Sequence, residues 1–124
     1  MTGYSVEIKE TSKELTAKER IALKDTSNAI KLDTACDEND VIIEPAYYVI
    51  LAIHNEKSDN VDYENYVIID KNGAKYVTGS LSFWYSFMDI YCEMDGEDEP
   101  WSINAYKLDS KNYKGKKFLT CSII

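Results

Sequence analysis

The last quarter of the chain, Trp101 to Ile124, restricts the fold most, because two alternating segments flank a basic one. In the segment 101–106 apolar and polar residues alternate, and the segment 118–123 repeats the pattern. A period of two residues is typical of a half-buried strand. The sequence therefore predicts a terminal β-hairpin, with residues 109–117 as the connection.

This connection is basic in an acidic protein. It and its flank carry five positive charges and one negative charge, Asp109, which gives +4 in a chain of net charge −8 and leaves −12 for all other residues. The five lysines are Lys107, Lys111, Lys114, Lys116 and Lys117. Ammonium groups neutralise phosphates, and an aromatic ring such as Tyr113 stacks on any base. The segment predicts a single-stranded nucleic-acid site; a solvated lysine-rich turn is the alternative.

Length and composition indicate one globular domain over residues 1–124. No apolar run approaches the ~20 residues of a membrane span. The N-terminus lacks the pattern of a secretory signal, so we expect a cytoplasmic protein (in the host cytoplasm if a phage encodes it) with no membrane partner. Cys36, Cys92 and Cys121 lack metal-site or CxxC spacing, so we expect no metal, and Cys121 in the core.

The first forty residues predict short elements. Tyr4–Ile8 reads as a strand, and the capping box formed by Thr16 and Glu19 predicts a helix over Ala17–Lys24 with Ile21 and Ala17 facing inward.

Two weaker segments follow. Ala29–Leu32 is a candidate short strand, and Asp37–Asp40 reads as an acidic surface turn.

Val41–Glu44 and Tyr47–His54 read as one long strand broken at Pro45, since proline cannot donate to a sheet. Both faces of this strand are apolar, as in a central or barrel strand. We interpret His54 as a polar strand end and not as a catalyst. A polar loop, Asn55–Asp62, follows.

The next two strands, Tyr63–Asp70 and Lys75–Thr78, flank Asn72-Gly73, which predicts a type I′ hairpin turn. Such a turn pairs Asp70 with Lys75, a favourable cross-strand match. It also pairs Ile69 with Tyr76 and Ile68 with Val77. The pattern leaves open which face of this hairpin is core.

A helix follows Ser80, its expected N-cap. Its apolar stripe recurs at spacings of three and four and comprises Phe83, Trp84, Phe87, Ile90, Tyr91 and Met94. We assign Trp84 to the core. The acidic run Asp95–Pro100 ends the helix.

This order of elements predicts a mainly β (α+β) fold. It matches an OB-fold-like five-stranded barrel, with a helix between strands three and four and a short N-terminal helix. In that fold, the loops 55–62 and 108–116 and the face of strands two and three bind oligonucleotides. The candidate residues added on this basis are Lys57, Tyr66, Lys75 and Tyr76.

Four segments resemble small single-stranded DNA-binding proteins encoded by phages of low-GC Gram-positive bacteria: Leu15–Glu19, Tyr76–Ser80, Phe83–Phe87 and Ser110–Cys121. The resemblance implies an OB-fold that binds single strands without sequence preference, in phage DNA replication and recombination. It implies roles for Lys111, Tyr113, Lys114, Lys116 and Lys117. Unlike many bacterial single-strand binders, the sequence shows no acidic tail, so we expect no recruitment through a tail.

Binding of this kind needs no cofactor and no small-molecule substrate, and no P-loop, HExxH or GxSxG motif indicates an enzyme. Because linked sites gain affinity, a homodimer is a candidate assembly. The main alternative is an acidic interaction module, for example a phage-encoded inhibitor or DNA mimic of a host protein, although the +4 segment opposes it. A hydrolase using the carboxylates of 95–99 is a remote third hypothesis. Nothing in the sequence separates DNA from RNA.

Overall fold

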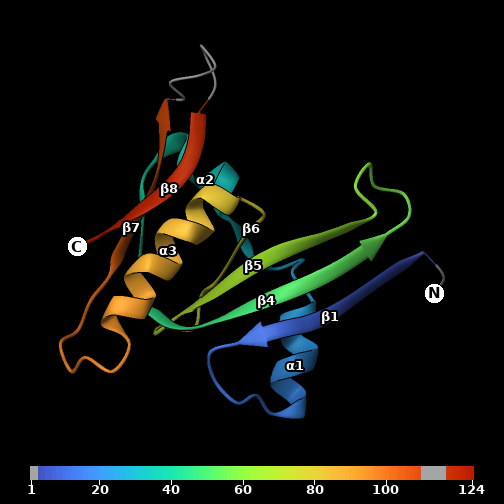
Figure 1. Ribbon diagram of the computed structural model, residues 1–124, viewed down its shortest axis with the longest axis horizontal. Coiled ribbons are helices and arrows are strands. Elements are labelled where there is room, and N and C mark those ends of the chain that lie inside the picture. Colours follow the sequence, from blue (N-terminus) through green and yellow to red (C-terminus); the bar gives the residue numbers. More distant parts are fainter. Residues whose placement is uncertain (1–2, 110–116) are drawn as a thin grey trace. The chain divides into compact units, whose positions relative to one another are not determined.

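The computed structural model describes residues 3–109 and 117–124, and there the chain is mainly β with three helices (Figure 1). The α+β class predicted from the sequence is confirmed. The elements are β1 (Tyr4–Thr11), α1 (Ala17–Lys24), β2 (Ile30–Lys31), α2 (Leu32–Glu38), β3 (Val41–Ile43), β4 (Pro45–Asn55), β5 (Asp62–Asp70), β6 (Lys75–Thr78), α3 (Leu81–Met94), β7 (Ile103–Asp109) and β8 (Lys117–Ile123).

The strands form two sheets, one in the order β1-β4-β5-β6-β2 and one in the order β3-β7-β8. Among the described strands, no pairing joins the two sheets into a closed barrel. The helix predicted between the third and fourth strands of a barrel is present as α3, between β6 and β7.

The long strand predicted over residues 41–54 is interrupted as expected. Its first part, β3, pairs with β7, while its second part, β4, lies between β1 and β5 in the other sheet. The interruption is Glu44, directly before Pro45, which is the first residue of β4. Strands that switch sheets at a bend are a common way to connect two sheets, and a proline that withholds an N–H donor is suited to that point.

The chain divides into two compact units. One combines Met1–Ile30 with Ala46–Gly79, and the other combines Lys31–Pro45 with Ser80–Ile124. Each unit is assembled from segments that are distant in sequence, so neither is a contiguous half of the chain.

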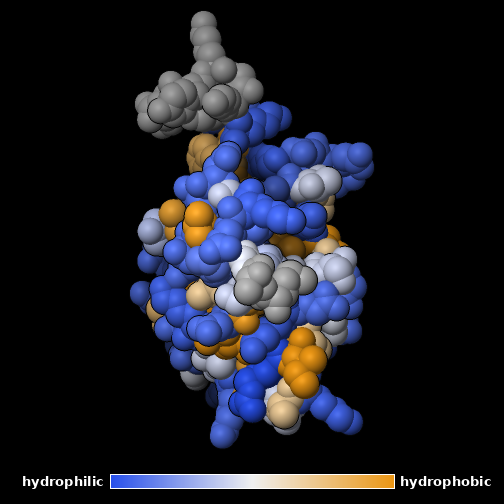
Figure 2. Space-filling model, turned by 90° about the vertical axis from the view of Figure 1, so that its right-hand side faces the viewer, coloured by the Kyte–Doolittle hydropathy of each residue, from blue (hydrophilic) through white to orange (hydrophobic). Residues whose placement is uncertain are grey.

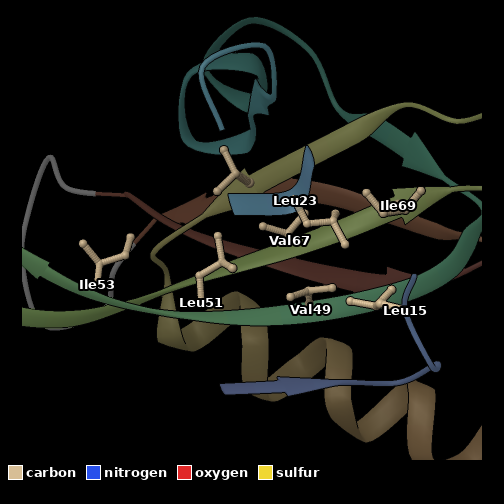
Figure 3. Close-up of a cluster of buried hydrophobic side chains, with 8 residues drawn as sticks. Leu15, Leu23, Val49, Leu51, Ile53, Val67 and Ile69 are labelled. Carbon is tan, nitrogen blue, oxygen red and sulfur yellow. The ribbon is translucent and has the colours of Figure 1, made fainter. Parts of the chain in front are cut away.

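The core of the first unit lies on one face of β4, β5 and β6 (Figure 3). Alternate residues of these strands supply it, and Leu15 and Leu23 of the N-terminal segment cover it. The full cluster is Leu15, Leu23, Val49, Leu51, Ile53, Val67, Ile69 and Val77. The opposite face of β4 is also buried, through Tyr48 and Ile50, which confirms that both faces of this strand are apolar and covered.

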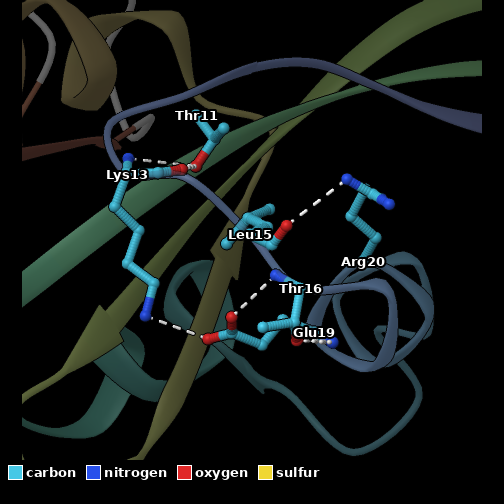
Figure 4. A network of polar contacts seen from close by, with 6 residues as sticks. All are labelled: Thr11, Lys13, Leu15, Thr16, Glu19 and Arg20. Carbon is cyan, nitrogen blue, oxygen red and sulfur yellow. Dashed lines mark hydrogen bonds and ion pairs between the residues drawn. The ribbon is translucent and has the colours of Figure 1, made fainter.

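Helix α1 has the predicted bounds and the predicted capping box (Figure 4). The Glu19 amide donates to Thr16 Oγ1 at 3.2 Å, and the Thr16 amide donates to Glu19 Oε1 at 2.9 Å. Lys13 adds an ion pair to Glu19 at 2.9 Å. The backbone bond from Thr16, followed by the bond from Lys13, lowers the pKa of the Glu19 carboxyl.

The inward positions predicted for Ile21 and Ala17 are wrong, because both residues are exposed. Ile21 is 73% exposed, and Leu23 is the buried residue of α1. Residues two positions apart on a helix differ by about 200° around its axis, so burying Leu23 turns Ile21 outward. The helix is too short for periodicity alone to reveal which of the two faces the sheet.

The turn between β5 and β6 differs from the prediction by one residue of register. Ile69 pairs with Lys75 and Ile68 with Tyr76. A type I′ turn needs positive φ at both central residues, but among the described residues only glycines have positive φ, and here that residue is Gly73 at 95°. The turn is instead closed by Asp70, whose carboxylate accepts from the Asn72 amide at 2.9 Å.

In the second unit, α3 begins at the predicted N-cap, where Ser80 Oγ accepts from the Phe83 amide at 3.2 Å. Phe83, Trp84 and Phe87 are buried, as predicted for the stripe. Helix α3 contacts β8, where Ser82 Oγ donates to the Leu119 carbonyl at 2.7 Å.

Helix α2 replaces part of what the sequence predicts as a strand and a turn. The strand is only Ile30–Lys31, and Asp37 belongs to the last turn of α2. Leu32 and Cys36, four residues apart, are its buried residues. A helix of seven residues depends on such packing and not on propensity, so local sequence alone gives a weak signal for it.

The core of the first unit predicts a specific stability difference. Leu51 is fully buried, so Leu51→Ala should lower the free energy of unfolding by about 2–5 kcal/mol. Leu81 is 52% exposed, so the same change there should cost within about 0.5 kcal/mol. Urea denaturation followed by circular dichroism measures both; equal losses for the two variants would contradict this core.

Candidate nucleic-acid interface

The predicted terminal hairpin is present. Strands β7 and β8 pair antiparallel in unbroken register from Ile103 with Ile123 to Asp109 with Lys117 (Figure 1). This register places Asp109 and Lys117 opposite each other at the end of the hairpin from which the basic segment departs. The predicted site residues Lys111, Tyr113, Lys114 and Lys116 lie outside the described residues.

Two predicted lysines lie on the described part of the hairpin, in different surroundings. The side chain of Lys107 is only 18% exposed, and its ammonium pairs with the Asp37 carboxylate of α2. That contact makes Lys107 a link between β7 and α2. Lys117 is exposed.

Sequence reasoning missed an exposed aromatic residue beside these lysines. Phe118 is 39% exposed and pairs across the hairpin with Leu108, which is 45% exposed. Its neighbour Leu119 is buried. The alternation of the last strand carries the signal, because Phe118 occupies the phase opposite to buried Leu119 and Cys121. An aromatic ring next to Lys117 is the combination that a stacking site needs.

Tyr66 and Tyr76 are not on the surface. Both rings are more than nine-tenths buried, and the Tyr66 hydroxyl donates to Glu64 Oε1 at 3.2 Å. Burial raises the pKa of the Tyr76 hydroxyl. Val67, Val77 and Ile69 on the other face of β5 and β6 are buried as well. The middle hairpin is therefore core on both faces, and neither tyrosine is accessible for stacking.

Lys75 is committed to a structural contact. Its ammonium donates to the carbonyl oxygens of Ala22 at 2.9 Å and Asp25 at 3.0 Å, and to Asn28 Oδ1 at 3.3 Å. These are the carbonyls at the C-terminus of α1, where a cation also interacts favourably with the helix dipole. Lys75 therefore caps α1.

Lys57 is exposed in the predicted polar loop between β4 and β5. The loop is closed at its base, where the Asn55 amide donates to the Val61 carbonyl at 2.7 Å. The Asn55 side chain accepts from the Lys57 amide at 3.1 Å. Lys57 remains a predicted contact.

His54, near the end of β4, makes contacts around this loop that the sequence did not predict. Its Nδ1 lies 2.8 Å from Asp62 Oδ1, across the base of the loop, and its Nε2 lies 3.7 Å from Glu56 Oε1. The hydrogen bond to Asp62 is the main cause that raises the pKa of the imidazole, and the Glu56 charge adds to it. His54 thus links the end of β4 to the start of β5.

A groove of about 390 Å³ opens beside this pair, across β1, β4 and β5. Its polar lining includes the carboxylates of Glu7, Asp62 and Glu64. These negative charges disfavour the binding of phosphate in this groove. On the face shown in Figure 2, hydrophilic side chains predominate and hydrophobic ones form small scattered groups.

Among the described residues, no group of three or more side chains that could ligate a metal ion is found. Cys121 is buried as predicted, and burial raises the pKa of its thiol to about 12, which keeps it protonated. None of the helices in the described part of the chain has the length and apolar character to cross a lipid bilayer.

Comparison with known proteins found no matching family model, no matching curated protein and no matching solved structure.

The His54–Asp62 contact predicts a measurable titration. His54 is the only histidine, so NMR of its ring protons gives its pKa directly; we expect it above the ordinary value of about 6.5. Because the folded pKa is the higher one, the stabilisation is complete below the unfolded pKa and is lost as pH rises through the folded pKa.

Asp62→Asn should bring the pKa of His54 back toward its ordinary value, since the main cause of the shift is removed. Asp59→Asn, a matched change at an exposed position in the same loop, should leave it unchanged. Equal effects of the two substitutions would show that general charge, and not this contact, shifts the pKa.

Proposed function

We propose that this protein binds single-stranded DNA without sequence preference, through the basic end of the β7–β8 hairpin, and acts in phage DNA replication or recombination. The observation that carries the proposal is the hairpin register. It places exposed Phe118 and Lys117 at the strand end that continues into the lysine-rich segment. An exposed ring beside an exposed lysine, preceded in the sequence by further lysines, fits a strand whose phosphates and bases are both accessible.

The charge distribution supports a localised contact. The segment 107–117 carries +4, whereas the remainder of the chain carries −12. Duplex-coating proteins rely on extended positive surface, which this composition does not supply. A concentrated positive end on an acidic protein directs a nucleic acid to that end and away from the remaining surface.

The strand connectivity supports an OB-type arrangement. One interrupted strand, β3 with β4, contributes to both sheets, the β5–β6 hairpin follows, and α3 precedes the β7–β8 hairpin. That is the order of an OB-fold, whose loop between the fourth and fifth strands contacts oligonucleotides. The likeness lies in the order of the elements: among the described residues, β6 pairs with β5 and β2 and not with β8. With both faces of β5–β6 buried, we assign binding to the loops and not to that sheet face.

The lysines predict a salt dependence. If about four phosphates are neutralised, the slope of log K against log salt for oligo(dT) is about −0.7 × 4, or roughly −3. Lys114→Ala with Lys117→Ala removes two of these contacts, so the slope should become shallower by roughly 1.4. Fluorescence anisotropy of a labelled oligo(dT), titrated at several salt concentrations, measures it.

The matched control is Lys31→Ala with Lys71→Ala, which removes the same charge at exposed positions outside the hairpin. It should leave the slope unchanged. Equal losses in both double variants would mean that only net charge matters. Absence of binding by the unaltered protein to single strands would favour the acidic interaction module instead.

The exposed ring makes a second prediction. Phe118→Ala should weaken oligo(dT) binding by about 1–3 kcal/mol, the contribution of one stacked base. Phe118→Tyr, which keeps an aromatic face, should retain binding. Tyr85→Ala removes another exposed ring, on α3, and should have no effect. Unchanged affinity of Phe118→Ala, with its fold verified by circular dichroism, would exclude Phe118 from the interface.

A further inference from the structure

A groove of about 350 Å³ lies in the second unit between α3 and the end of β8. Asp89, Ile90, Glu93 and Met94 of α3 line one side, and Ile123 of β8 lines the other. Residues 89 and 93, like 90 and 94, are four apart and therefore neighbours on one side of the helix. The groove thus combines an apolar lining with two carboxylates.

Side chains that line this groove are exposed or lack a polar partner within their own unit. Ile123 is 47% exposed at the groove. Within the part of the chain that the structure describes, the side chains of Asp89 and Glu93 have no hydrogen-bond or ion-pair partner. The last turn of α3 carries no basic residue, and the helix dipole disfavours carboxylates near a C-terminus. An apolar group flanked by cations would satisfy both features.

The outer face of α1 has that chemistry. Ile21 is 73% exposed. Lys18 and Lys24 lie three residues before and after it, so both flank it on the same side of the helix. Over the described residues, neither lysine side chain has a hydrogen-bond or ion-pair partner. The capping box and the Lys75 contacts hold α1 at both ends, so this face is presented by a fixed helix.

We propose that α1 of one copy of this protein docks in the α3–β8 groove of a second copy. Ile21 contacts Ile90, Met94 and Ile123 in this arrangement. Lys18 and Lys24, about 9 Å apart along their helix, face Asp89 and Glu93, about 6 Å apart along theirs. The flexible lysine side chains accommodate the difference. A second copy is the chosen partner because the chain itself carries both complementary surfaces.

The two surfaces are different, so the contact is heterologous. Repeated from copy to copy, such a contact joins molecules head to tail, in rings or in open chains. The contact is small, so association is weak and is detected only at high protein concentration. Its charged pairs are exposed, so added salt weakens it. It needs no nucleic acid and does not rest on the proposed DNA-binding function.

Sedimentation velocity without nucleic acid tests the proposal. In low salt, the average mass should rise above the 14.2 kDa monomer as concentration increases from about 10 µM to about 1 mM, the range of a weak interface. The rise should diminish at high salt. A monomer throughout this range would overturn the proposal.

Charge exchange tests the pairing itself. Lys18→Glu with Lys24→Glu makes the α1 face acidic, and Asp89→Lys with Glu93→Lys makes the groove basic. Each double variant alone should remain monomeric, because like charges then meet. A mixture of the two should assemble again, since acidic α1 meets the basic groove and basic α1 meets the acidic groove. Failure of the mixture to recover the mass of the unaltered protein would overturn this pairing.

Two controls keep the test independent of folding and of net charge. Lys31→Glu with Lys57→Glu makes the same charge change at exposed positions outside both surfaces. This control should retain the self-association that Lys18→Glu with Lys24→Glu loses. Ile21→Ser should weaken association by roughly tenfold without altering any charge. Equal loss in the Lys31 and Lys57 control would attribute the effect to net charge and overturn the proposal.

Discussion

Burial of the central strand on both faces is the constraint on which the structure depends. Val49, Leu51 and Ile53 point into the core of the first unit, while Tyr48 and Ile50 on the opposite face are equally covered. Because water has little access to the backbone of such a strand, its N–H and C=O groups need hydrogen-bonded neighbour strands on both edges. Strands β1 and β5 supply them. Burying each such side chain contributes about 1.5–3 kcal/mol.

The same burial decides which residues are left for function. Because both faces of β5 and β6 are covered, Tyr66 and Tyr76 contribute to stability. Lys75 is engaged at the C-terminus of α1, which it caps. Lys107 likewise joins β7 to α2. Lys117 and Phe118, in contrast, are exposed at a strand end. This is the physical reason for proposing an interface made of loops.

Opposite charges are separated along the chain, and the separation supports both proposals. The positive segment at the end of the β7–β8 hairpin is suited to phosphates, and the basic face of α1 is suited to the acidic groove beside α3. The apolar residue that lies beside the lysines differs between these two positive regions. Phe118 offers an aromatic face, whereas Ile21 offers an aliphatic side chain that cannot stack on a base. The chemistry of the neighbouring residue therefore assigns the two regions to different ligands.

The sequence alone determined the elements with strong local signals. The capping box at Thr16, the N-cap at Ser80, the interruption at Pro45 and the terminal hairpin all follow from interactions within a few residues, or from a period of two. Tertiary structure decided the features for which the local sequence pattern allows more than one arrangement. It turned Ile21 outward in favour of Leu23, shifted the β5–β6 register by one residue, and formed α2 through the packing of Leu32 and Cys36. It also buried two tyrosines and engaged two lysines, because residue type reports the chemistry of a side chain, whereas its accessibility depends on segments distant in sequence.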